Sequence, residues 1–173
     1  APEVRAQILE VAAEDPSIVT EQYLEAAIDE KGRIGIQAIR IAGRLRFEQF
    51  SPLLRSIADQ ADPARRAASY AALLRLGDRN GPEPDKRLSQ MMVSSDPAER
   101  AAALEESVPV DGLVTPDLIA AALTDPATAV RSKALAVAAQ LPDERYIPQI
   151  VECLKVPDLR LAARSTLAAF PAS

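Results

Sequence analysis

The fold is decided by one short stretch, Asp125-Pro126-Ala127-Thr128-Ala129-Val130-Arg131-Ser132-Lys133-Ala134-Leu135. Its Asp-Pro pair opens a turn and supplies a helix cap, and apolar residues follow at helical spacing. Similar stretches begin at Asp96-Pro97 and Asp62-Pro63, and weaker copies lie near residues 4, 34 and 159. The chain therefore contains an internal repeat, and the length of this repeat indicates the fold.

The copies align on a column occupied mostly by arginine: Arg5, Gly35, Arg66, Arg100, Arg131 and Arg160. The intervals are 30, 31, 34, 31 and 29 residues. Three residues later the side chain is mostly small, at Ile8, Ala38, Ser69, Ala103, Ala134 and Ala163. The next residue is mostly large and apolar, at Leu9, Ile39, Tyr70, Leu104 and Leu135, with Arg164 as the exception. Ten residues after the column come Leu45, Leu76, Val110, Leu141 and Phe170. Columns at this spacing predict one buried stripe on each helix.

A second helical stretch precedes most of these turns, at residues 20–28, 50–60, 85–93, 115–123 and 145–154. We call this stretch the A helix of each repeat and the arginine-bearing one the B helix. The array predicts an all-α protein in which one lone B helix is followed by five A–B hairpins. The fourth B helix is expected to end early, near Ser107, because Pro109 follows it.

This pattern resembles the HEAT family, in particular the short bacterial HEAT-like repeats of about 31 residues. The resemblance covers almost the whole chain and implies one domain over residues 1–173, a right-handed α-α superhelix. In that family the Asp and Arg columns form a ladder between stacked repeats. The resemblance carries this role to Asp125 and Arg131 and to their equivalents Arg66, Arg100 and Arg160, while Gly35 departs from the pattern.

Composition agrees with closely packed helices. Of the 173 residues 33 are alanine, only 3% are aromatic, and the net charge is -5. Small side chains let helices approach each other, and an acidic balance argues against nucleic acid as the main ligand. No apolar run is long enough for a membrane span, so we expect a cytoplasmic segment. The missing initial Met and the uncapped ends lead us to expect a piece of a larger bacterial polypeptide.

The residue inventory excludes much chemistry. The chain has no histidine, so Ser-His and Cys-His nucleophile pairs cannot form within it. Zinc lacks its usual ligands, and no glycine-rich phosphate loop occurs. Cys153 is expected to be a buried, unreactive thiol. The sequence thus predicts a protein that is not an enzyme and that has no metal and no cofactor.

Residues 31–46 contain basic residues and no acidic one, although the chain as a whole is acidic. Arg33, Arg40 and Arg44 lie at i, i+7 and i+11, on one stripe of the second B helix, and Arg75 occupies the register of Arg44 in the next repeat. Such a patch suits an acidic peptide, a phosphate group or an anionic lipid head. The alternative is a solvated face that is neutralised by Glu48, Asp62 or other carboxylates.

A second candidate surface is the segment 77–85, whose glycine, asparagine and proline residues predict a loop between repeats. Such an insertion is either tolerated or part of a binding face. The predicted function is a non-catalytic protein-interaction scaffold or regulatory module. Its partner would be another protein or other domains of the same polypeptide. Two alternatives stay open: the cytosolic module of a bacterial nucleotide-transporter-like or cyclic-nucleotide-binding membrane protein, and a bilin-lyase-like subunit.

Overall fold

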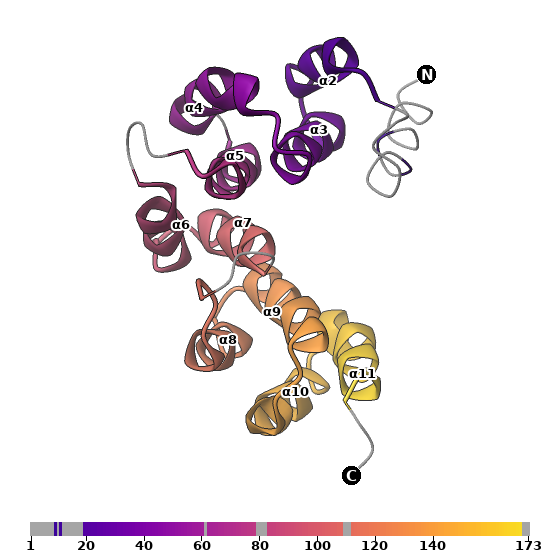
Figure 1. Ribbon diagram of the computed structural model, residues 1–173. Coiled ribbons are helices and arrows are strands. Elements are labelled where there is room, and N and C mark those ends of the chain that lie inside the picture. The colour runs from indigo at the N-terminus through magenta and orange to yellow at the C-terminus, as the bar shows by residue number, and fades with distance from the viewer. Residues whose placement is uncertain are drawn as a thin grey trace. The chain divides into compact units, whose positions relative to one another are not determined.

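The computed structural model describes residues 9, 11, 19–60, 62–78, 83–108 and 112–170. Within these residues the protein contains helices and turns and no strand (Figure 1). The prediction of an all-α protein is confirmed for this part of the chain. The lone N-terminal B helix lies outside the described residues, except for Leu9 and Val11, which are both helical.

The helices group into two compact units, Ala1–Gln90 and Met91–Ser173. The first unit contains α2 (Glu21–Ile28), α3 (Arg33–Arg44), α4 (Ser51–Gln60), α5 (Pro63–Leu76) and most of α6 (Pro84–Met92). A short 3-10 turn, η2 (Glu48–Phe50), leads directly into α4. Helix α3 packs against both α2 and α5, and α4 packs against α5.

The second unit contains α7 (Pro97–Ser107), α8 (Pro116–Leu123), α9 (Thr128–Gln140), α10 (Ile147–Cys153) and α11 (Arg160–Ala168). Two 3-10 turns, η3 (Glu144–Tyr146) and η4 (Pro157–Leu159), precede α10 and α11. Helix α9 packs against α7, α8 and α11, while α10 packs against α8 and α11. The five predicted A helices are confirmed to within two residues as α2, α4, α6, α8 and α10, and the early end of α7 at Ser107 is confirmed as well.

Helices α2, α5, α7 and α8 each begin at a side chain that caps the helix. The Asp62 carboxylate accepts from the backbone N–H groups of Ala64 and Arg65 at the start of α5, and Asp96 does the same for Ala98 in α7. Thr115 caps α8 in front of Pro116. These side chains accept hydrogen bonds from the first backbone N–H groups of each helix, which have no carbonyl partner within the helix. Asp125 was expected to cap α9 as well, and this is wrong: α9 begins at Thr128 and its N-cap is Ala127.

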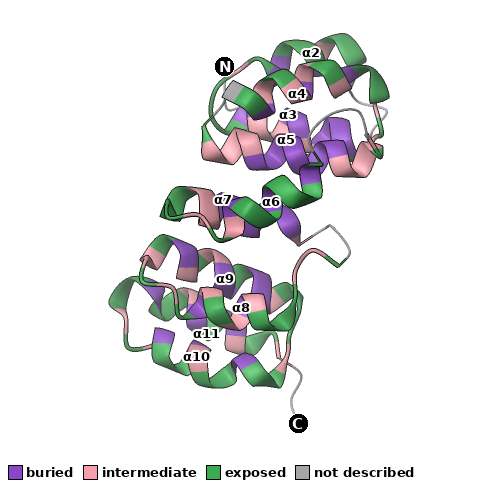
Figure 2. Cartoon of the chain, turned by 90° about the vertical axis from the view of Figure 1, so that its left-hand side faces the viewer, coloured by how far each residue is buried: buried purple, intermediate pink, exposed green. Residues whose placement is uncertain are grey.

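The small column of the repeat lies at the helix contacts. Ala38, Ser69, Ala103, Ala134 and Ala163 have no exposed surface, and the large column that follows is buried at Ile39, Tyr70, Leu104 and Leu135. Figure 2 shows the buried residues along α3, α5, α7 and α9, the helices that carry these columns. A side chain no larger than alanine or serine lets two helices approach closely, which accounts for the alanine excess.

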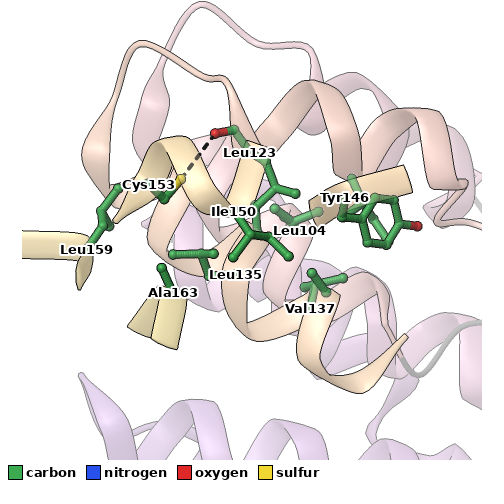
Figure 3. Packing of buried hydrophobic residues seen from close by; sticks show 12 residues of the cluster. Leu104, Leu123, Leu135, Val137, Tyr146, Ile150, Cys153, Leu159 and Ala163 are labelled. Atoms are coloured by element: carbon green, nitrogen blue, oxygen red, sulfur yellow. Dashed lines mark hydrogen bonds between the residues drawn. The ribbon is translucent and has the colours of Figure 1, made fainter. Parts of the chain in front are cut away.

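In the second unit the apolar columns form one core (Figure 3). Leu104, Leu123, Leu135, Tyr146 and Ile150 are almost completely buried and belong to one packed cluster. The Thr166 hydroxyl of α11 donates to the carbonyl oxygen of Leu135 in α9 at 3.0 Å, which ties two successive B helices together. The residues ten positions after the arginine column are not all buried in the core.

Leu141 belongs to that later column, and its predicted burial is wrong, because the side chain is 42% exposed. Its backbone forms the C-cap of α9, so the chain has already left the helix and the helical spacing no longer sets its direction. Leu45, Leu76 and Phe170 of the same column are half-buried, and Val110 lies outside the described residues.

Candidate functional site

The predicted arginine stripe lies on α3. Arg33 and Arg44 are exposed and Arg40 is half-buried, while Ile34 and Ile41 are buried on another side of the same helix. The helix therefore separates a cationic stripe from an apolar stripe, as its sequence spacing requires. Each of these arginines also interacts with another group of the chain, so an incoming anion would have to compete with that contact.

Arg75 lies in the last turn of α5, which packs against α3. Gly43 of α3 approaches Ala72 of α5, so the C-terminal halves of the two helices meet, and Arg44 and Arg75 each lie in the last turn of their helix. Arg75 is only half exposed to solvent, however, and its Nη1 atom is buried. The sequence spacing predicted that Arg75 occupies the same repeat position as Arg44, but it did not predict that the Arg75 Nη1 atom is buried.

Two further observations bear on the alternative explanation of this charge. Asp62, a predicted counter-ion, uses its carboxylate to cap α5. Arg44 and Arg75 each occupy the last helical turn, where a cation is stabilised by the carbonyl end of the helix. The position of Arg44 and Arg75 is therefore favourable for folding even without a ligand. The solvent-exposed arginines of the patch, Arg33 and Arg44, both lie on α3.

The loop at residues 77–85 is described only at its two ends. Gly77 ends α5 in the left-handed region, at φ 68°, where a residue without Cβ is favoured. Asp78 accepts from the Arg55 Nε atom at 2.8 Å, which ties the residue after the end of α5 to α4. Residues 79–82, which include most of the predicted turn signals, lie outside the described residues.

Within the arginine column, Arg100 of α7 forms an ion pair with Asp125 in the turn before α9. Arg100 Nε and Nη2 donate to the two Asp125 oxygens at 2.8 and 2.9 Å, and Nη1 donates to the carbonyl oxygens of Ser94 and Ser95. Asp125 also accepts from the Ala127 backbone N–H at 2.8 Å. These hydrogen bonds, above all that from Arg100, hold the pKa of the Asp125 carboxyl below its usual value.

The other arginines of the column have different partners. Arg160 Nε donates to the carbonyl oxygen of Leu154 at 3.1 Å, six residues back, where Arg100 contacts Ser94. Arg131 reaches Thr128 at 3.4 Å, and its Nε is buried without a hydrogen-bond partner among the described residues. The position that matches Asp125 for Arg131 is Val156, which offers no carboxylate. Arg66 is half-buried near the start of α5.

A cavity lies beside the Arg100–Asp125 pair. It measures about 180 Å³. Apart from the ion pair its lining is apolar and comes from the end of α6, from α7, α8 and α9: Met92, Val93, Leu104, Leu118, Ala121, Ala122 and Val130. All these residues belong to the second unit. No sequence motif marks this cavity, because its walls come from four helices.

The described residues offer little for covalent or metal chemistry. No group of three potential metal ligands comes together among them. Cys153 is buried, its thiol donates to the carbonyl oxygen of Leu123 at 3.6 Å (Figure 3), and burial raises its pKa. A thiol with a raised pKa and no access to solvent is a poor nucleophile. No helix in the described part of the chain has the length and apolar character to cross a bilayer.

Comparison with known proteins adds no relative: no family model, no curated protein and no solved structure matches this chain.

Proposed function

We propose that the chain is a non-catalytic protein-interaction module, built from HEAT-like hairpins that stack into a right-handed superhelix. The packing of α3 on α5, and of α7, α9 and α11 in succession, supports such stacking inside each unit. A hairpin cannot bury its apolar face alone, so stacked repeats share a core and leave their remaining faces for partners. The proposed partner is another protein or another domain of the same polypeptide.

The observation that carries this proposal is the cationic stripe of α3. Arg33, Arg40 and Arg44 lie on one side of a helix whose other side is buried, in a protein with a net charge of -5. Arginine is the side chain best suited to pair with carboxylates, because its planar guanidinium donates two parallel hydrogen bonds. The proposed ligand is an acidic, extended segment of a partner.

The test is a titration of a fluorescein-labelled, glutamate-rich peptide with the protein, followed by fluorescence anisotropy. We expect saturable binding that weakens as salt is added, because solvent-exposed charges are screened. The double variant Arg33→Glu with Arg44→Glu should lose binding, with the helical circular dichroism unchanged.

The matched control reverses two exposed charges elsewhere, Lys86→Glu with Arg87→Glu on α6. It changes the net charge by the same amount and should leave peptide affinity within about two-fold, as expected for charges outside a contact surface. Equal loss in both variants would show a net-charge effect and would contradict a site on α3. No binding by the unmodified protein would also reject it.

A further inference from the structure

A groove in the second unit has the size of a small-molecule site. Its volume is about 470 Å³, within the roughly 300–1,000 Å³ typical of such sites. Its walls come from the start of α8, the end of α9 and the 3-10 turn η3, all in the second unit. The apolar part of the lining consists of Val114, Pro116, Ile119, Leu141 and Pro142.

The charge that lines this groove is already paired within the protein. Asp143 is the one charged residue of the lining. Its carboxylate accepts from Arg145 Nη2 at 2.7 Å and from the Arg145 backbone N–H at 3.0 Å, and these hydrogen bonds hold its pKa below the usual value. A carboxylate with these partners does not require a cation from a ligand, so the groove favours an uncharged molecule.

The Tyr146 hydroxyl is the polar group that lacks such a partner. The Tyr146 side chain lines the groove and is 1% exposed, and its hydroxyl points away from the packed apolar cluster (Figure 3). No group in the described part of the chain forms a hydrogen bond with this hydroxyl. Burial is the main cause that raises its pKa, so the hydroxyl keeps its proton at neutral pH and remains a donor.

The first unit shows that the fold does not need a hydroxyl at this place. The stretch Glu48-Gln49-Phe50-Ser51-Pro52 leads into α4 as Glu144-Arg145-Tyr146-Ile147-Pro148 leads into α10. Phe50 and Tyr146 each end a 3-10 turn, and both rings are buried. A phenylalanine ring therefore fills the matching position. A buried hydroxyl without a partner costs free energy, so Tyr146 is best explained by an acceptor that a ligand supplies.

We propose that this groove binds a small, uncharged, mostly apolar molecule, and that the Tyr146 hydroxyl donates a hydrogen bond to an acceptor on it, such as a carbonyl oxygen. The hydrocarbon part of the ligand packs on the apolar lining. It thereby covers Leu141, which is 42% exposed. This inference uses no residue of the α3 stripe and does not depend on the proposed function.

The first experiment compares two neutral probes of the same shape. These are 2-acetylnaphthalene and 2-isopropenylnaphthalene, in which a methylene group replaces the carbonyl oxygen. Each probe is titrated into isotope-labelled protein and followed by methyl NMR. We expect saturable shifts of the Ile119 and Leu141 methyl signals, and unchanged signals from Leu161 on α11, outside the groove. The ketone should bind roughly three- to tenfold more tightly, as one net hydrogen bond provides.

The second experiment removes the hydroxyl. Tyr146→Phe should abolish the difference in affinity between the two probes and leave the affinity for the hydrocarbon probe unchanged. Because Phe50 fills the matching place in the first unit, this variant should keep the helical circular dichroism and the thermal stability of the original protein.

The third experiment fills the groove. Leu141→Trp enlarges a partly exposed residue of the lining and should prevent binding of both probes. The matched control is Val151→Trp on α10, because Val151 is 41% exposed and does not line the groove. This control should bind both probes as the original protein does.

Each of the following results would overturn the inference. Absence of saturable binding by either probe rejects the groove as a ligand site. Equal affinities for the two probes in the original protein, or a difference that survives Tyr146→Phe, reject the hydrogen bond. Binding that persists in Leu141→Trp, or that Val151→Trp also removes, assigns the probes to other apolar surface. A Tyr146→Phe protein that fails to fold gives the hydroxyl a structural role instead.

Discussion

Gly43 of α3 lies against Ala72 of α5 so closely that no side chain fits between the two helices. A Cβ atom on Gly43 would lie 2.7 Å from the Ala72 Cα and 2.8 Å from its Cβ, well inside van der Waals contact. The pair joins two successive B helices at their C-terminal halves, beside Arg44 and Arg75. Gly43, which no sequence pattern singled out, thus sets how closely α3, the helix with the candidate binding stripe, approaches α5.

Gly43→Ala should therefore destabilise the protein, although alanine is the better helix former. At a contact-free helical site the change would stabilise the protein by roughly 0.5–1 kcal/mol. Here the added methyl group forces the helices apart, and overpacking of a core costs about 1–3 kcal/mol. Urea unfolding of the two proteins measures the difference.

The companion variant is Ala72→Gly. In the double variant the space is partly restored, so its loss of stability should be smaller than the sum of the two single losses. Additive losses, or a Gly43→Ala protein that is more stable than the original, would mean that α3 and α5 do not meet at these residues.

The Arg100–Asp125 pair predicts a pH dependence of stability. The folded-state pKa of Asp125 is lowered, chiefly by the Arg100 hydrogen bonds, so the carboxylate contributes stability above its ordinary pKa. That contribution is lost as the pH falls through the lowered value. Asp125→Asn should remove it, so that the stability difference from the original protein is large at neutral pH and shrinks in acid.

Chemical unfolding at neutral pH and at a series of acidic values measures this difference. Asp158→Asn serves as the control, because Asp158 is exposed and the substitution makes the same charge change. A difference between Asp125→Asn and the original protein that stays constant with pH would contradict a charge-assisted pair.

Thr115→Ala should destabilise α8. The Thr115 hydroxyl accepts from the backbone N–H of Leu118 at 3.3 Å and caps the first turn. Loss of such a cap costs about 1 kcal/mol. Thr115→Ser keeps the hydroxyl and should retain most of the stability in thermal unfolding, whereas equal losses in both variants would attribute the effect to the missing methyl group.

The Cys153 thiol should resist alkylation in the native protein. It is buried and its pKa is raised, so both access and the thiolate fraction are low. With a neutral alkylating reagent at mildly alkaline pH, we expect modification only as fast as the unit opens, and rapid modification in denaturant. Mass spectrometry follows the reaction. Native-state labelling as fast as that of the denatured chain would contradict the packing around α10.

Part of the candidate site could be predicted and part could not. The stripe of Arg33, Arg40 and Arg44 follows from helical spacing along one element, and all three lie on α3 as expected. The burial of the Arg75 Nη1 atom and the cavity beside Asp125 did not follow. Each depends on where neighbouring helices lie, and the order of residues within one helix carries no signal for that.

The amino-acid sequence by itself determined where the helices are. Caps such as Asp62 and Asp96, the prolines after them and the apolar spacing act over a few residues, so local chemistry was enough. Only the tertiary structure decided that Asp125 binds Arg100 and does not cap its own helix, and that Leu141 turns toward solvent. The physical reason is that these outcomes depend on the approach of separate helices, and an approach such as that of Gly43 to Ala72 follows from the packing of whole surfaces.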